Sequence, residues 1–295
     1  MSSFMSGFAA FAITASGWKK RMSDPAKCDK YIEKLRKINA EPFDLPTYPY
    51  HSLVDKRIVD NTEVLHFNIG RDKKIIYLHG GAYCEPPRIL HFLMCDNISY
   101  NTDYEIIFPL YKRAPNSTFK VTYAFLENYY KSLLETTAPE NIVFMGDSSG
   151  GGLSLGFAQY LKTVNLPQPS KIIMFSPWLD VSMSEPFSPE LDKLDPNLVH
   201  GFLKKAGKFW AGDTDVRDYR VSPIYGDLKD LAPITVFMGT HEAILPDARR
   251  FRDRCREEGA YLDYREFENM NHAFIVYPIP EAKKAQSEVI DLLKK

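Results

Sequence analysis

Ser148 lies in the short sequence Gly146-Asp147-Ser148-Ser149-Gly150, between an apolar run and a segment with helical spacing. A serine hydroxyl acts as a nucleophile only when a neighbouring base takes its proton and the side chain projects clear of its own strand. A sharp turn from strand to helix provides that projection, and the flanking glycines relieve the crowding of the turn. The pattern predicts that Ser148 is a catalytic nucleophile, the alternative being a glycine-rich loop that merely turns the chain.

A second motif, His79-Gly80-Gly81-Ala82, follows another apolar run. Small residues let backbone N–H groups approach the oxygen that becomes negative in a tetrahedral intermediate. We expect Gly81 and Ala82, with Gly80 as a further candidate, to form an oxyanion hole together with Ser149, the residue after the nucleophile. His79 is expected to support this loop by hydrogen bonding rather than to act as the base.

The base and the acid of such a site should come late in the chain. His272 follows the last predicted strand and is the best placed of the seven histidines. Glu242 and Asp247 both lie between the strand 234–240 and this histidine, where the acid belongs. Glu242 is favoured because it is nearer the strand end, whereas Asp247 falls in the first turn of a helix, where an acid also serves as a cap. Asp180 is a third candidate.

Composition limits the classes of function. The 295 residues are 44% apolar and 25% charged, which is typical of a soluble globular protein with one large domain or one domain and a cap. A net charge of −1 argues against nucleic acid as a partner. The four cysteines lack metal-ligand spacing, so we expect reduced thiols, a cytoplasmic location, no metal and no organic cofactor.

The elements that must position these groups alternate along the chain. Apolar runs separated by segments of helical spacing predict strands at 64–69, 74–80, 104–111, 141–146, 171–178, 234–240 and 261–267. This order predicts an α/β fold with a mostly parallel central sheet and helices on both faces. Residues 184–225 contain helical stretches but no strand, and we interpret them as an insertion above the sheet, where substrate sites of such folds lie.

The N-terminal region differs in character from the rest. A helix is expected to start at Ser23-Asp24-Pro25, and the proline-rich segment 41–49 leads into the main domain. The apolar run from Phe4 to Ile13 is too short to span a bilayer, and its charges follow it, unlike those of a secretory signal. A helix covering the active site is favoured over one touching a membrane surface, although such contact of residues 1–18 stays open.

These motifs together resemble the hormone-sensitive lipase family of α/β-hydrolases, especially its bacterial esterases. The likeness is carried by His79-Gly80-Gly81-Ala82, by GDSSGG (146–151) and by MNHAF (270–274), and it extends over about residues 70–280. Four further segments match in order: YKRAP (111–115), SPWLD (176–180), SPIYGD (222–227) and GTHE (239–242).

The resemblance implies an α/β-hydrolase domain at 46–295, and a cap made by residues 1–45 together with the insertion at about 184–225. It implies Ser148 as nucleophile, His272 as base and an acid at the position of Glu242. Two positions depart from the family pattern. Ala82 replaces a glycine; it still offers an N–H group and is expected to narrow the acyl pocket. Glutamate replaces the usual aspartate at 242.

The resulting hypothesis is a serine carboxylesterase that hydrolyses small, uncharged, short-chain acyl esters through an acyl-enzyme. One alternative is a protein that binds a small ligand on the same fold without turnover. The plant gibberellin receptors resemble this family but lack its histidine, whereas His272 is present here. Another alternative keeps the triad for acyl transfer, amide cleavage or deacetylation. The sequence leaves a homodimer open.

Overall fold

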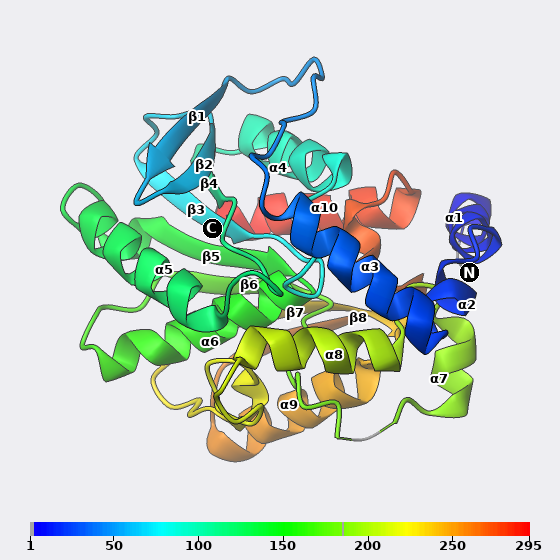
Figure 1. Cartoon of the computed structure of the whole chain (residues 1–295). Helices are drawn as coiled ribbons and strands as arrows, with labels where there is room; N and C mark the ends of the chain where they lie inside the picture. Colours follow the sequence, from blue (N-terminus) through cyan, green and yellow to red (C-terminus); the bar gives the residue numbers. More distant parts are fainter. Residues whose placement is uncertain (1–2, 185) are drawn as a thin grey trace.

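Eight strands form one sheet in the order β1-β2-β4-β3-β5-β6-β7-β8 in the computed structural model, which describes residues 3–184 and 186–295 (Figure 1). The strands are β1 (Val54–Val59), β2 (Thr62–Phe67), β3 (Lys73–Leu78), β4 (Tyr104–Pro109), β5 (Ile142–Asp147), β6 (Lys171–Phe175), β7 (Ile234–His241) and β8 (Leu262–Asn271). The pairs β1/β2 and β2/β4 are antiparallel and all others are parallel. The predicted α/β fold with a mostly parallel sheet is confirmed.

Two strands differ from the sequence prediction. β1 was not predicted, because Asp55, Lys56 and Arg57 give it no apolar alternation; it is an edge strand with its central residues exposed. β8 is longer than expected and extends through Asn271, directly before His272. The sheet therefore delivers this histidine from the end of a strand.

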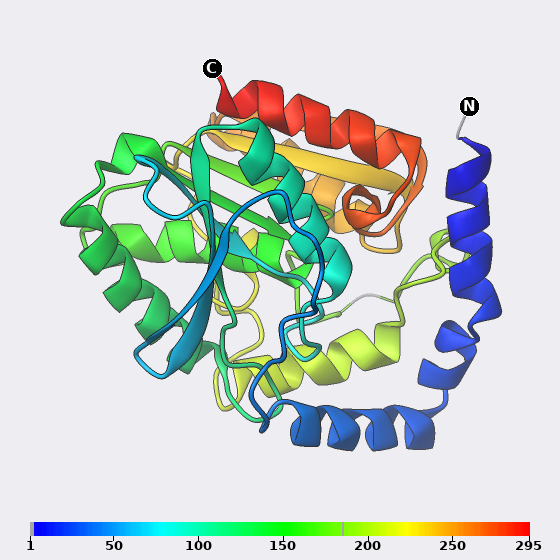
Figure 2. The same ribbon diagram turned by 90° about the horizontal axis from the view of Figure 1, so that it is seen from above.

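Helices cover both faces of the sheet. The helices α4 (Ile89–Asn101) and α10 (Pro280–Leu293) pack on one face (Figure 2), and α5 (Phe119–Leu134), α6 (Ser149–Thr163) and α9 (Leu245–Glu258) pack on the other. Successive β3 residues alternate between these layers: Ile75 and Tyr77 belong to the first, Ile76 and Leu78 to the second. Central strands with two buried faces must be apolar throughout, and this explains the continuous apolar runs in the sequence.

The N-terminal helices and the insertion lie at one end of the molecule (Figure 1). The N-terminal helices are α1 (Phe4–Ala15), α2 (Trp18–Met22) and α3 (Pro25–Ile38). The helices of the insertion are α7 (Pro189–Leu194) and α8 (His200–Ala211). The predicted helix start is confirmed, since the Asp24 side chain accepts hydrogen bonds from the N–H groups of Ala26 and Lys27. The Trp18 indole N–H donates to the carbonyl of Asn197 at 2.8 Å and so joins the two segments.

Three short 3-10 helices complete the fold: η1 (Pro139–Asn141), η2 (Pro223–Tyr225) and η3 (Phe274–Val276). Within residues 3–184 and 186–295, every helix is too short or too polar to cross a bilayer.

Candidate active site

Ser148 lies at the turn between β5 and α6. Its backbone has φ 51° and ψ −120°, a conformation that costs energy for any residue with a side chain. The turn can form because Gly150 lets the chain after β3 approach closely: a Cβ there would lie 1.9 Å from the carbonyl oxygen of Leu78. Hydrogen bonds from Ser148 N–H to Phe175 and from Trp178 N–H to Ser148 fix the turn at 2.8 and 2.9 Å.

The structure brings together three residues that are far apart in the sequence. His272 Nε2 lies 2.8 Å from Ser148 Oγ, and His272 Nδ1 lies 2.8 Å from Glu242 Oε2. A carboxylate can only accept a hydrogen bond, so Nδ1 carries the hydrogen and Nε2 is free to take the serine proton. All three side chains are buried except for a small part of the serine and the imidazole.

Charges around the imidazole favour its protonated form. Burial by itself would lower the pKa of His272, but the hydrogen bond and charge of Glu242, assisted by the charges of Asp195 and Asp147, raise it above 6.5. Glu242 also accepts hydrogen bonds from the Ser176 hydroxyl, at 2.6 Å, and from a backbone N–H. Burial raises the pKa of Glu242 itself. The pair is thus arranged to stabilise an imidazolium as it forms.

The two other candidate acids lie elsewhere. Asp247 Oδ1 lies 3.5 Å from the Arg250 guanidinium, and burial raises the pKa of Asp247 to about 6. Asp180 accepts a hydrogen bond from the Tyr225 hydroxyl at 2.7 Å and also pairs with Arg250. Over the described residues, neither carboxylate has a hydrogen bond to the ring of His272, so Glu242 is the acid that the fold places against it.

The loop after β3 presents backbone donors to the serine. Gly81 and Ala82 have φ values of 117° and 52°, and both line the cavity into which Ser148 opens. Their N–H groups have no acceptor in the part of the chain that is described, and Ser149 N–H, at the first position of α6, has no partner within the helix. Gly80 differs, because its N–H donates to Asp147 Oδ1 at 2.9 Å.

His79 is buried under this loop and is hydrogen-bonded to it. Its Nδ1 lies 2.6 Å from the carbonyl oxygen of Gly80, to which it donates, and its ring stacks on Tyr111 with centroids 4.4 Å apart. Burial, together with the charges of Arg113 and His91, lowers the pKa of His79 to about 3. A ring held neutral in this way is a structural hydrogen-bond donor.

His91 is a further residue of the site, because it lines the same cavity as Ser148. Its Nδ1 accepts the N–H of Arg88 at 2.9 Å, so the hydrogen is on Nε2, which lies 3.3 Å from Asp147 Oδ2. Burial would raise the pKa of Asp147, but His91 and the hydrogen bonds from Tyr77 and Gly80 lower it to about 2. No motif marks His91, because α4 itself was not predicted.

Asp195 is a second residue without a sequence signal. It is fully buried in the insertion, and its carboxylate accepts hydrogen bonds from the N–H groups of Ala243, at 2.8 Å, and Asn197, also at 2.8 Å. The Asn197 side chain in turn donates to the carbonyl of His272 at 3.3 Å. The insertion is therefore hydrogen-bonded both to the residue after Glu242 and to His272.

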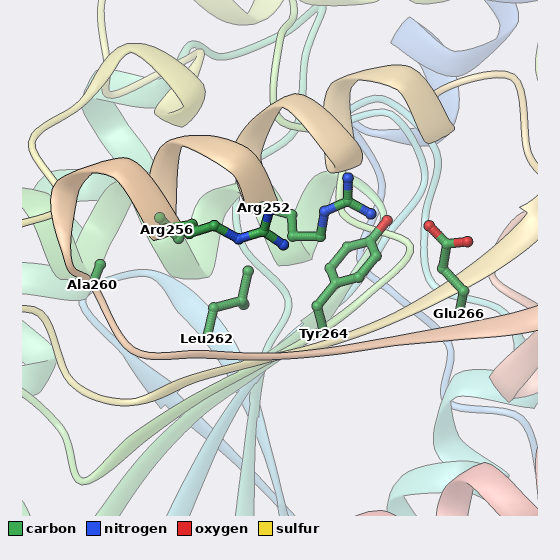
Figure 3. Close-up of a pocket in the computed structure, with 7 residues that line it drawn as sticks. Arg252, Arg256, Ala260, Leu262, Tyr264 and Glu266 are labelled. Carbon is green, nitrogen blue, oxygen red and sulfur yellow. The ribbon is translucent and has the colours of Figure 1, made fainter.

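A cavity of about 490 Å³ opens over the serine and the imidazole. Its lining comes from the catalytic loops, from α4, from the insertion and from the N-terminal helices, which contribute Ala12, Ile13, Ser16, Trp18 and Arg21. A second cavity of about 570 Å³ lies between α9 and β8, where Arg252, Arg256, Tyr264 and Glu266 line it (Figure 3). None of Ser148, Glu242 and His272 lines that second cavity.

In residues 3–184 and 186–295 there is no group of three or more His, Cys, Asp or Glu side chains suited to a metal ion. The four cysteines are buried free thiols.

Comparison with known proteins gives a consistent result. The family described as alpha/beta hydrolase fold matches residues 75–276. An esterase of Acinetobacter venetianus is 28% identical over 222 residues, which cover 74% of this chain and 73% of that protein. The crystal structure of an inferred esterase from Staphylococcus aureus has a TM-score of 0.88 at 29% identity and covers 92% of this chain and 94% of its own. The crystal structure of an esterase from the bacterial hormone-sensitive lipase family has a TM-score of 0.78 at 23% identity, and the match covers 90% of this chain and 96% of that chain.

Proposed function

This chain is an ester hydrolase of the alpha/beta hydrolase fold family, and we propose that it is a serine carboxylesterase acting on small, uncharged esters with short acyl chains. The observation that carries the proposal is the continuous hydrogen-bonded path from Glu242 through His272 to Ser148, which ends in a cavity of ligand size.

In the first half-reaction, Ser148 Oγ attacks the carbonyl carbon of the ester while its proton passes to His272 Nε2. The carbonyl oxygen becomes negative and accepts hydrogen bonds from the N–H groups of Gly81, Ala82 and Ser149. Glu242 stabilises the imidazolium. The bond from carbon to the alcohol oxygen then breaks, the alcohol takes the proton from His272, and the acyl group remains on Ser148.

In the second half-reaction, a water molecule gives one proton to His272 Nε2 and attacks the acyl carbon. The same backbone donors hold the second oxyanion. When it collapses, the carbon–Oγ bond breaks and Ser148 regains the proton from His272. The sum is one ester and one water converted to one acid and one alcohol, without a metal or an organic cofactor.

The lining of the cavity supports a short, uncharged acyl group. Ala82 places a methyl group beside the nucleophile, where the family pattern has glycine. The ring of the next residue, Tyr83, is buried and stacks on the buried ring of Trp210 with centroids 4.2 Å apart. Of the two arginines on the lining, Arg88 is paired with Glu85 at 2.9 Å, which offsets its charge, and Arg21 is exposed to solvent.

The contact between His272 and Ser148 favours turnover over mere binding, because a receptor has no need of a base 2.8 Å from a strained serine. Acyl transfer, amide cleavage and deacetylation would use the same three groups. A screen of acyl esters, acetylated sugars and amides would rank these reactions.

Ser148→Ala tests the proposal. We expect it to abolish hydrolysis of p-nitrophenyl acetate and butyrate in a protein that circular dichroism shows to be folded. Ser132→Ala, an exposed serine on α5, serves as the control and should retain activity. A serine-directed phosphonate should add mass to a peptide containing Ser148 in the wild type only. Undiminished turnover by Ser148→Ala would refute the assignment.

The acyl preference has its own measurement. A series of p-nitrophenyl esters under one assay condition should give the highest kcat/KM with short chains. An optimum beyond about ten carbons would contradict a cavity of this size.

A further inference from the structure

Helix α1 is oriented with its large apolar side chains outward. Phe4, Phe8 and Phe11 are 89%, 62% and 67% exposed, whereas Ser6 is 6% exposed. Positions 4, 8 and 11 share one face of a helix, and soluble proteins normally turn such a face toward the core. Figure 2 shows α1 at the periphery of the molecule, with no other element covering its outer side.

This orientation is held by contacts on the inner side. Ala12 and Ile13 line the cavity over Ser148, so the inner face of α1 forms part of the wall of that cavity. At the start of the helix, the Ser3 hydroxyl donates to Glu281 Oε2 at 2.9 Å, and the Ser6 hydroxyl, which donates to the carbonyl of Ser3 at 2.7 Å, lies 3.4 Å from the other carboxylate oxygen. Turning the phenylalanines inward would break both sets of contacts.

Charge indicates what could cover the outer face. Residues 1–40 contain eight Lys and Arg against three Asp and Glu, a formal charge of +5, while the whole chain carries −1 and the remainder therefore −6. Lys20 and Arg21 follow α1 directly, are exposed, and form no salt bridge with any described carboxylate. A basic segment beside an apolar helix face is typical of binding to anionic lipid headgroups. A second copy would instead bring one positive segment against another.

We propose that α1 and α2 bind the surface of an anionic lipid bilayer. Phe4, Phe8 and Phe11 enter the boundary between headgroups and acyl chains, and Lys20 and Arg21 contact the anionic headgroups. The helix has 12 residues, a length of about 18 Å, so it lies along the interface instead of spanning the bilayer. The inner face of the same helix lines the catalytic cavity, which is thereby held at the interface where amphiphilic esters gather.

Only the delivery of esters rests on the proposed function; the binding does not. The first experiment therefore measures sedimentation of the full chain carrying Ser148→Ala with two kinds of vesicle. One kind is phosphatidylcholine alone and the other is phosphatidylcholine and phosphatidylglycerol in equal parts. We expect binding to the anionic vesicles, weaker binding to the neutral ones, and a decline with added salt.

Variants divide the binding between the two groups of side chains. Phe4→Ala/Phe8→Ala/Phe11→Ala should weaken binding to anionic vesicles by at least about tenfold. Its matched control, Leu53→Ala/Ile58→Ala/Tyr100→Ala, removes three exposed apolar side chains elsewhere and should bind like the parent protein. Lys20→Gln/Arg21→Gln should weaken binding by about fivefold for each charge removed. In an otherwise wild-type chain, the phenylalanine variant should keep its turnover of dissolved p-nitrophenyl acetate.

Either of two kinds of result, in vesicle binding or in oligomeric state, would overturn the proposal. One is the absence of binding to anionic vesicles, or equal binding by the phenylalanine variant. The other is a dimer in light scattering that the phenylalanine variant converts to a monomer, which would assign this face to a second copy. If the wild-type chain binds anionic vesicles but hydrolyses no ester, that result would contradict the proposed esterase reaction and leave the proposed lipid binding standing.

Discussion

At the scale of single residues, the proposed reaction depends on a neutral His272 as its base. The pKa of this imidazole lies above 6.5, because the charge and hydrogen bond of Glu242 outweigh the opposing effect of burial. The acidic limb of the profile of kcat/KM against pH reports the pKa of the base in the free enzyme. We therefore expect activity to be lost on acidification with a midpoint above 6.5, and kept as the pH rises.

Glu242→Gln should move this limb to lower pH, since burial then acts on the imidazole without a compensating negative charge. The measurement is a kcat/KM profile for both proteins with one soluble ester. A wild-type midpoint below 6.5, or an unchanged midpoint in the variant, would show that Glu242 does not set the charge state of His272.

The identity of the acid can be tested separately. Glu242→Ala removes the group 2.8 Å from His272 Nδ1 and should lower kcat by about 10³- to 10⁴-fold, since the imidazole loses its orientation and its counter-charge. Asp247→Asn alters a carboxylate that contacts Arg250 and should change kcat little. Steady-state kinetics on proteins with matched thermal unfolding would decide, and the reverse ranking would reassign the acid.

At the scale of elements, the loop after β3 is packed directly onto the end of β5. A Cβ on Gly80 would lie 2.2 Å from Asp147 Oδ2, so Gly80→Ala must displace either the carboxylate or the loop that carries the oxyanion donors. We expect the free energy of unfolding to fall by about 1–3 kcal/mol. We also expect kcat to fall by about 100-fold, because misplacement of catalytic groups by about 1 Å has that effect.

Gly201→Ala is the control for this variant. Gly201 lies in the first turn of α8 with open space around its Cα, so its substitution should leave the free energy of unfolding and kcat nearly unchanged. Thermal unfolding and initial rates measure both quantities. A Gly80→Ala protein with normal kcat would show that the oxyanion loop does not depend on this close packing.

At the scale of the whole molecule, the N-terminal helices and the insertion both line the cavity over Ser148, and we propose that they act as one cap. Trp18 joins them: its ring packs against Tyr31 and Phe202, with centroids 5.2 and 6.0 Å apart, and its N–H donates to Asn197. Trp18→Ala removes two aromatic pairs, each worth about 0.5–1.5 kcal/mol, and should raise KM by up to about tenfold while lowering kcat less.

Limited proteolysis should detect the same change as faster cleavage within residues 3–40 of the Trp18→Ala protein. Trp18→Phe keeps the ring contacts without the indole N–H, so its KM and its cleavage rate should lie between those of the wild type and of Trp18→Ala. Wild-type KM and proteolysis in the alanine variant would contradict the proposal that residues 1–45 and 184–225 act as one cap.

Much of the fold could be predicted because local sequence carries it. Central strands buried on both faces must be apolar, so β3 to β7 were visible as runs, and Asp24-Pro25 marks the start of α3. The predicted membership of the α/β-hydrolases and the likeness to esterases, carried by short motifs in a fixed order, are confirmed by the family match and the esterase relatives. β1 and α4 were not predicted. β1 is an exposed, charged edge strand without apolar alternation, and the apolar residues of α4 are not confined to one helical face, so neither segment has a clear hydrophobic period.

The sequence by itself determined which atoms could do the chemistry, since a serine among glycines after a buried strand and a histidine after the last strand are local patterns. Only the tertiary structure decided which partners these atoms have. It placed Glu242 rather than Asp247 against His272, engaged Gly80 N–H with Asp147, and brought His91 and Asp195 to the site. It also turned the phenylalanines of α1 outward. The physical reason is that hydrogen bonds and burial are set by distances between segments far apart in the chain, and spacing along the chain carries no such distance.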